Sequence, residues 1–174
     1  VAFFFFFSYK YDSNLVMRGD VSKDTVVVAE ADEFDRSFLR LFPDVAVVTS
    51  ADPDHLDIYG DHQSMLKSFG DFISQINKGG TLMIHHSVAS LAASNKNITV
   101  HTYGMNQGQF FAGNLTTTGG FFTFDLIGPS TQINGITLGV PGFHNVENAI
   151  AAALVAKNLG ISDDVIRKAL GSFR

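Results

Sequence analysis

The stretch Val-Val-Val-Ala-Glu-Ala-Asp-Glu-Phe-Asp at residues 26–35 decides the fold. Its first four residues form a continuous apolar run rich in β-branched side chains, which is typical of a strand buried on both faces of a parallel sheet. Carboxylates follow as soon as the run ends. A second run, Val-Ala-Val-Val at residues 45–48, leads in the same way into Ala-Asp-Pro-Asp-His-Leu-Asp at residues 51–57. We therefore expect neighbouring parallel strands whose polar loops meet at the carboxyl edge, where open α/β sheets bind ligands.

The residues that follow alternate between helical and strand patterns. Apolar side chains at spacings of three and four predict an amphipathic helix over residues 61–78, stopped by Gly79-Gly80. Strands are expected at residues 81–84 and 98–103, with a short helix at 87–94 between them. This alternation predicts a parallel sheet with right-handed crossovers.

After Gly104 the pattern changes to short strands separated by turn residues. Three runs, at residues 110–117, 121–127 and 136–140, are divided by Gly-Gly, Gly-Pro and Asn-Gly and predict antiparallel hairpins. Helices follow at residues 145–159 and after Ser162, which can cap the last one. The expected fold class is α/β, with a mostly parallel sheet flanked by helices and a small antiparallel β-sheet. The five phenylalanines at residues 3–7 could form a buried strand, yet they do not alternate with polar residues and five large rings in a row are hard to pack on both faces of a sheet, so they fit this fold poorly.

Composition narrows the classes of protein. The chain has 174 residues, 45% of them hydrophobic and 17% charged, which fits one globular domain and excludes a disordered chain. No apolar stretch approaches the roughly 20 residues that cross a bilayer, so we expect no membrane insertion. The absence of cysteine fits a cytoplasmic location. A net charge of -5 argues against nucleic acid as a partner.

Acidic residues are concentrated around the two polar loops. Eight of the 17 fall within residues 30–57: Glu30, Asp32, Glu33, Asp35, Asp44, Asp52, Asp54 and Asp57. Such crowding is stabilised when a cation binds among the carboxylates, or when water screens them at a solvated surface. Glu30 is a candidate Mg²⁺ ligand because it directly follows a strand, with a helix-capping cluster as the alternative. His55 is a candidate metal ligand or proton carrier, with an ordinary surface histidine as the alternative.

A third polar motif, Phe-His-Asn-Val-Glu-Asn at residues 143–148, opens an alanine-rich helix. A helix N-terminus with one imidazole and two amides can bind an anion or the edge of a nucleobase. His144, Asn145 and Asn148 are therefore candidate binding residues. The alternative is that Asn145 is only the N-cap of the helix.

Together, and in this order, the three motifs resemble the central ATP-binding domain of the Mur ligases. They are Glu-Ala-Asp-Glu-x-Asp, Asp-x-Asp-His-x-Asp-x-Tyr and His-Asn-x-x-Asn-Ala. The details around them are most similar to the branch that adds L-alanine to UDP-N-acetylmuramate. These are Asp-Arg-Ser-Phe-Leu at residues 35–39, Asp-Pro-Asp-His-Leu-Asp-Ile-Tyr-Gly at 52–60, and Tyr-Asp-Ser-Asn at 11–14.

The resemblance implies a ligase in peptidoglycan precursor synthesis that uses ATP to convert a carboxylate into an acyl phosphate, which an amine then attacks. It implies ATP and Mg²⁺ as cofactors, and UDP-N-acetylmuramate and L-alanine as substrates. Glu30 and His55 would be the catalytic Mg²⁺ ligands, and His144, Asn145 and Asn148 would lie on the adenine side. Bridging two anionic oxygens with a cation is chemically consistent with this reaction, because it removes their repulsion.

Some features of the family are missing from this sequence. No Gly-x-x-x-x-Gly-Lys-[Ser/Thr] phosphate loop occurs in it. The family's N-terminal UDP-binding domain and C-terminal domain are also missing. We therefore expect residues 1–174 to be a fragment, a central domain that is inactive alone.

Three other functions remain open at this stage. One is a related Mur ligase that adds a peptide to UDP-N-acetylmuramate in cell-wall recycling. Another is a non-catalytic nucleotide-binding module. The third is a metal-dependent hydrolase that uses Asp54, His55 and Asp57, although such sites generally need more imidazoles.

Overall fold

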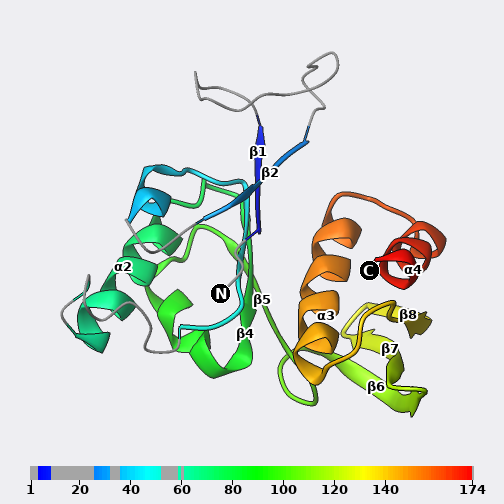
Figure 1. Cartoon of the computed structure of the whole chain (residues 1–174). Helices are drawn as coiled ribbons and strands as arrows, with labels where there is room; N and C mark the ends of the chain where they lie inside the picture. Colours follow the sequence, from blue (N-terminus) through cyan, green and yellow to red (C-terminus); the bar gives the residue numbers. More distant parts are fainter. Residues whose placement is uncertain (1–3, 9–25, 32–35, 52–58, 60, 174) are drawn as a thin grey trace. The chain divides into compact units, whose positions relative to one another are not determined.

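A computed structural model describes residues 4–8, 26–31, 36–51, 59 and 61–173 (Figure 1). The chain divides into two compact units. The first contains residues 1–82 and 90–100, and the second contains residues 83–89 and 101–174. The strands β4 (Thr81–His85) and β5 (Thr99–Gly104) each begin in the first unit and end in the second.

Three strands of the first unit show how its sheet departs from the expected one. The phenylalanine run forms β1 (Phe4–Ser8), which pairs antiparallel with both β2 (Val26–Glu30) and β3 (Val45–Val48). β2 and β3 therefore run in the same direction, as expected, but β1 lies between them. The prediction that they are neighbours is wrong, because sequence periodicity did not assign the phenylalanine run to a strand. Their carboxyl ends still lie at the same edge, about 10 Å apart at the usual strand spacing.

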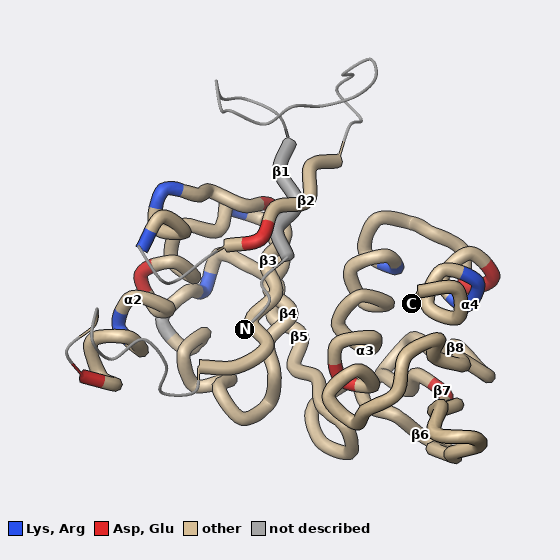
Figure 2. The backbone as a smooth tube through the Cα atoms, viewed as in Figure 1, with Lys and Arg blue, Asp and Glu red and all other residues tan. Residues whose placement is uncertain are grey.

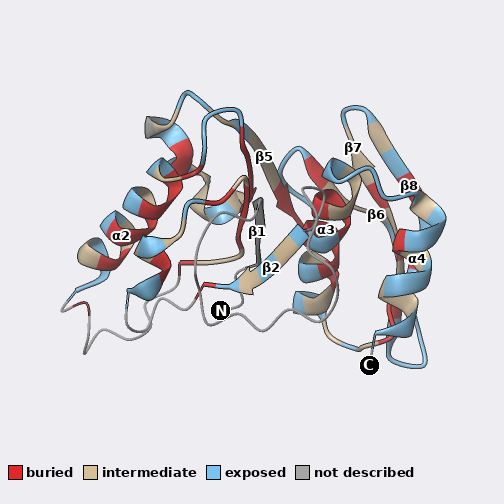
Figure 3. Ribbon diagram, turned by 90° about the horizontal axis from the view of Figure 1, so that it is seen from above, coloured by how far each residue is buried: buried red, intermediate tan, exposed pale blue. Residues whose placement is uncertain are grey.

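The helical part of the first unit is built on aromatic packing. The helix α2 (His62–Ser74) has one buried and one exposed face (Figure 3). Phe69 and Phe72 on the buried face pack against Phe38 of the short 3-10 helix η1 (Ser37–Arg40), with ring centroids 5.7 and 5.4 Å apart. All four residues of β3 are buried. Each large apolar side chain removed from water in this way contributes about 1.5 to 3 kcal/mol to stability.

α2 begins where the sequence predicts and ends four residues earlier. Asp61 is its N-cap and accepts a hydrogen bond from the backbone N–H of Ser64 at 2.7 Å. After Ser74 the backbone leaves the α-helical pattern, because the N–H of Asn77 donates to the carbonyl of Pro43 at 2.9 Å, and the neighbouring side chains bond to the same region. Gln75 donates to the carbonyl of Leu39 at 2.8 Å, and Asn77 donates to the Asp44 carboxylate at 2.9 Å.

The second unit contains the antiparallel strands. β6 (Phe110–Thr118) pairs in parallel with β5, and β7 (Phe121–Gly128) and β8 (Thr131–Thr137) follow in antiparallel order. The antiparallel strands thus continue from β5 within one mixed sheet flanked by helices, which confirms the α/β class. The short helix expected at residues 87–94 is the 3-10 segment η2 (His86–Ser94), which is kinked at Val88.

β8 corrects one prediction. The sequence predicts a strand over residues 136–140 that starts after an Asn-Gly turn, whereas Asn134-Gly135 lies inside the strand. Gly135 has φ +67°, and the register with β7 shifts beside it, so the dipeptide marks a bulge. Asp125 on β7 accepts the Gly135 N–H at 2.8 Å and an Asn114 amide bond at 2.7 Å, and these bonds lower the pKa of Asp125.

Two helices complete the second unit. α3 (Phe143–Asn158) packs on β6, and α4 (Asp163–Ser172) packs on β8 and carries charges of both signs (Figure 2). Ser162 is the N-cap residue of α4, as predicted, and two aspartates lie in its first turn. Lys157, at the far end of α3, pairs with Asp163 at 2.8 Å and ties the two helices together. None of the helices in the described part of the chain is long and apolar enough to span a membrane.

Candidate functional site

The first polar motif begins at the carboxyl end of β2. Glu30 is the last residue of that strand, and its side chain is exposed. The next residue, Ala31, is buried and anchors the exit from the strand. Asp32, Glu33 and Asp35 lie outside the described residues. Glu30 thus presents a solvent-exposed carboxylate at the carboxyl edge of the sheet. Carboxylate oxygen is the ligand atom that Mg²⁺ prefers.

His55 and the aspartates of the second motif also lie outside the described residues, but the positions that flank them are described. The guanidinium of Arg36, directly after the first motif, lies 4.8 Å from the ring centre of Tyr59, the last residue of the second motif. His62 Nε2 is 3.0 Å from the carbonyl oxygen of Ala51, so the two ends of the second loop are also joined. The bases of the two polar loops are therefore held together, although β1 separates their strands.

No group of three or more possible metal ligands occurs among the described residues. The predicted pair of Glu30 and His55 stays a prediction, because only Glu30 is described. A single carboxylate at a strand end fits the usual protein share of a nucleotide-bound Mg²⁺, which keeps most of its ligands from phosphates and water.

The third motif forms the first turns of α3. The helix starts at Phe143, two residues earlier than predicted, with Gly142 as N-cap, so the alternative that Asn145 is the N-cap is wrong. Gly142 has φ +106°, and a Cβ there would lie 2.7 Å from Cε1 of His144. The positive φ favours glycine at this position, because residues with a Cβ are strained there. The helix start is therefore fixed by a backbone conformation that motif patterns do not reveal.

The three candidate side chains of this turn differ in their surroundings. The Asn145 amide donates to the carbonyl of Pro141 at 2.6 Å and so closes the loop before the helix. His144 and Asn148 are exposed and lie one helical turn apart, on the same face. These two are free to present a ring nitrogen and an amide to a ligand, whereas Asn145 has a structural contact.

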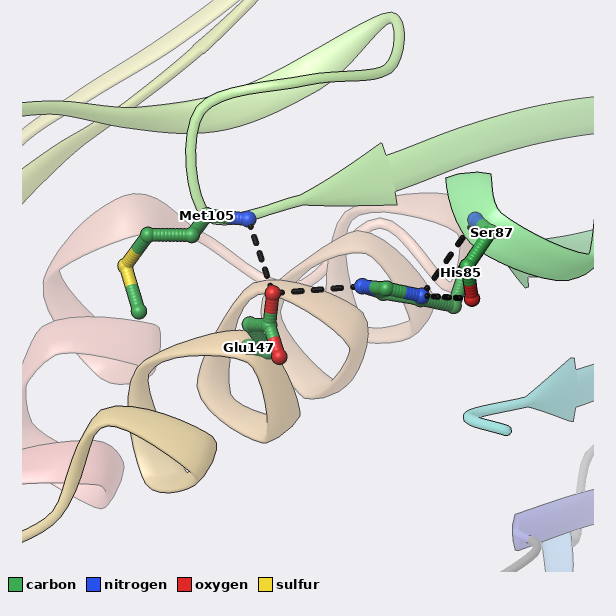
Figure 4. Close-up of polar contacts among 4 residues, drawn as sticks. All are labelled: His85, Ser87, Met105 and Glu147. Carbon is green, nitrogen blue, oxygen red and sulfur yellow. Dashed lines mark hydrogen bonds and ion pairs between the residues drawn. The ribbon is translucent and has the colours of Figure 1, made fainter. Parts of the chain in front are cut away.

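A polar cluster that the motifs do not predict lies beside this turn (Figure 4). Oε1 of Glu147 lies 3.1 Å from Nε2 of His85, at the end of β4, and accepts the backbone N–H of Met105 at 3.1 Å. The other ring nitrogen of His85 lies 2.7 Å from the Ser87 hydroxyl. Glu147 is 62 residues from His85 in sequence, so no local spacing signals this contact.

Tyr103 of β5 lies against the same cluster. Its ring is 5.6 Å from that of His85, edge-on, and the residue is only 1% exposed. Its hydroxyl is the one buried side-chain polar atom without a hydrogen-bond partner in the described part of the chain. Burial, followed by the charge of Glu147, raises the pKa of this phenol far above its usual value. Tyr103 therefore stays neutral.

The mixed sheet and the order of the three motifs are those expected of the middle domain of a Mur ligase, and a comparison with known families agrees. The model of the Mur ligase middle domain matches residues 13–156. The chain belongs to the Mur ligase family.

The curated relatives that the chain matches carry the name of one member of this family. The chain is 40% identical over 167 residues to UDP-N-acetylmuramate–L-alanine ligase of Phocaeicola vulgatus, covering 96% of this chain and 36% of the relative. It is 41% identical over 165 residues to the enzyme of the same name from Flavobacterium psychrophilum, covering 94% and 34%. The chain thus spans about a third of the length of the curated relatives it matches.

Solved structures agree on the fold. UDP-N-acetylmuramate-alanine ligase MurC from Thermotoga maritima superposes with a TM-score of 0.71 at 24% identity, covering 86% of this chain and 33% of that one. MurF from Acinetobacter baumannii gives 0.66 at 23% identity, covering 81% and 31%.

Proposed function

We propose that the chain is the nucleotide-handling middle domain of a ligase that joins L-alanine to UDP-N-acetylmuramate in peptidoglycan precursor synthesis. The observation that carries this proposal is the identity of about 40%, over nearly the whole chain, to relatives that bear that name. Because those relatives are about three times as long, the complete reaction is assigned to a full-length ligase of which this chain is one part.

The cofactors proposed are ATP and Mg²⁺. Fold neighbours support a nucleotide, since one structure is MurF from Thermotoga maritima in complex with ADP, at a TM-score of 0.59. The exposed carboxylate of Glu30 at the sheet edge supports a metal site. When bound, Mg²⁺ would neutralise charge between the terminal phosphate and the substrate carboxylate.

Within this proposal each motif of the chain has a distinct task. Glu30 and His55 hold the metal, and the Arg36–Tyr59 contact keeps their two loops together. His144 and Asn148 bind the adenine edge, because both are exposed on one face of α3. Asn145 holds the helix start in place through Pro141. The phosphate cradle is supplied by residues outside this sequence, which has no phosphate-loop motif.

We also propose that the protein acts in the cytoplasm, where ATP and nucleotide sugars are available. The lack of cysteine is consistent with this compartment.

The test is ligation by the full-length protein. UDP-N-acetylmuramate, ATP and Mg²⁺ are incubated with L-alanine, glycine, L-serine or an L-alanine-initiated tripeptide, and the products are identified by mass. The proposal predicts one alanyl product per phosphate released, with L-alanine preferred. Preference for the tripeptide would instead indicate a recycling ligase. Nucleotide binding without any product would indicate a binding module.

A further inference from the structure

We propose that Glu147 is a positioning residue that fixes the first turns of α3 to the ends of β4 and β5, and so sets where Asn148 and His144 meet the nucleotide base. This inference deepens the proposed function and rests on its assignment of the adenine site to α3. Glu147 lies between the two binding residues in sequence, one position before Asn148 and three after His144.

The protonation pattern of the cluster follows from its hydrogen bonds. The backbone N–H of Ser87 lies 3.4 Å from Nδ1 of His85, and a backbone N–H can only donate. An ionised carboxylate can only accept, so the contact between Nε2 of His85 and Oε1 of Glu147 places a proton on Nε2. From Nε2 the ring donates to Oε1 of Glu147 at 3.1 Å.

One carboxylate oxygen thus joins three segments of the second unit. Oε1 of Glu147 accepts from His85 at the end of β4 and from the Met105 backbone directly after β5, and Glu147 itself belongs to the second turn of α3 (Figure 4). The His85 side chain is only 14% exposed and that of Glu147 31%, so water competes weakly for these bonds. Charge-assisted hydrogen bonds of this kind are among the stronger ones.

The hydrogen bonds of Glu147 restrain the rotation of α3, and with it the helix face that carries His144 and Asn148. Glu147 points toward the strand ends, whereas its helical neighbours His144 and Asn148 are exposed. A helix has 3.6 residues per turn, so a rotation that freed Glu147 would turn Asn148 by the same angle. Small displacements of a recognising group weaken binding strongly, because hydrogen bonds require close alignment.

The test uses the full-length ligase with four variants. Glu147→Ala removes the shared acceptor, and Glu147→Gln keeps an oxygen in its place. Lys157→Ala is the matched control, because it breaks the 2.8 Å ion pair to Asp163 at the other end of α3, about 15 Å along the helix. Asn148→Ala removes the direct contact. Each is measured for kcat and KM with ATP and with GTP, and for its unfolding temperature.

We expect Glu147→Ala to raise the KM for ATP about tenfold and to reduce the preference for ATP over GTP, with kcat changed less than about twofold. In Glu147→Gln the KM for ATP should return most of the way to the value of the unchanged ligase. Lys157→Ala should lower the unfolding temperature without changing the KM. An unchanged KM in Glu147→Ala, or an equal change in Lys157→Ala, would overturn the positioning role.

Two further results separate this inference from the proposal beneath it. If Asn148→Ala itself leaves the KM for ATP unchanged, the adenine assignment fails and the positioning role fails with it. If Asn148→Ala raises KM and Glu147→Ala does not, only the positioning role is wrong. Should Glu147→Ala not fold, His85→Ala removes one donor and keeps the Met105 bond. It is expected to raise KM about threefold, and an unchanged KM there would overturn the role.

Discussion

Replacing Asn148 by alanine separates binding from folding. The residue is exposed within α3, and no hydrogen bond of its side chain occurs among the described residues. Alanine is a better helix former than asparagine by about 0.5 kcal/mol, so the free energy of unfolding should stay the same or rise slightly. Any loss of function in Asn148→Ala therefore reports a contact with a ligand.

The expected size of that loss follows from the hydrogen bonds an amide can make. An amide offers a donor and an acceptor that match the amine and ring nitrogen on one edge of adenine, and guanine presents the opposite pattern. Losing this pairing costs about 1 to 3 kcal/mol, which corresponds to a rise of about 5- to 150-fold in the KM for ATP. The kcat at saturating ATP should change little, because adenine is remote from the transferred phosphate.

Steady-state kinetics of the full-length ligase with ATP and GTP make the measurement, with thermal unfolding as the control for folding. An unchanged KM and an unchanged nucleotide preference would refute the reasoning. A fall in kcat at constant KM would also refute it, because it would place Asn148 in the chemical step.

Three further predictions concern other residues. Glu30→Ala and His55→Ala in the full-length ligase should each lower kcat by more than about 100-fold and alter its dependence on Mg²⁺, while the unfolding temperature stays nearly unchanged. Equal losses of stability and activity would show that the two residues have a structural role instead. Tyr103→Phe removes a buried hydroxyl that has no partner among the described residues. The free energy of unfolding, measured with denaturant, should stay unchanged or rise by about 1 kcal/mol. A clear loss of stability would show that the hydroxyl is hydrogen-bonded. Hydrogen bonds from Ser64 lower the pKa of Asp61 below 3.8, so this cap stabilises the fold above that pH and loses its effect on acidification through the lowered pKa. On acidification from neutral pH to below 3.8, Asp61→Asn should therefore lose less stability than the unchanged protein, and identical acid profiles would contradict this.

Part of the fold follows from the sequence because β3 and β4 are continuous apolar runs, whereas the run at residues 26–29 forms the edge strand β2, whose exposed Val26 and Val28 show that the prediction of burial on both faces is wrong. The run at residues 45–48 is fully buried in β3, and the Asp61 cap marks the start of α2. The β1 strand was not predicted, since five large rings in a row are hard to pack on both faces of a sheet and the strand partners of these phenylalanines lie 20 or more residues away. The bulge in β8 was mistaken for a turn because Asn-Gly suits both, and only pairing with β7 distinguishes them.

The candidate site is predictable to a smaller extent. Motif order locates Glu30, His144 and Asn148, which the structure finds exposed. It does not locate Glu147 or His85, because a contact across 62 residues depends on how α3 packs beside β4 and β5. The binding role that motif order assigns to Asn145 stays a prediction, and its amide is hydrogen-bonded to the carbonyl of Pro141.

We propose above all that this chain serves, within a full-length ligase, the transfer of a phosphate from ATP to a carboxylate ahead of attack by L-alanine. The most direct measurement uses UDP-N-acetylmuramate labelled with oxygen-18 in its carboxylate, turned over by the full-length ligase with ATP, Mg²⁺ and L-alanine. If an acyl phosphate forms, one labelled oxygen leaves with the phosphate when the amine attacks, so the released inorganic phosphate carries the label. Alanyl product formed with unlabelled phosphate, or with the label in AMP, would contradict the account.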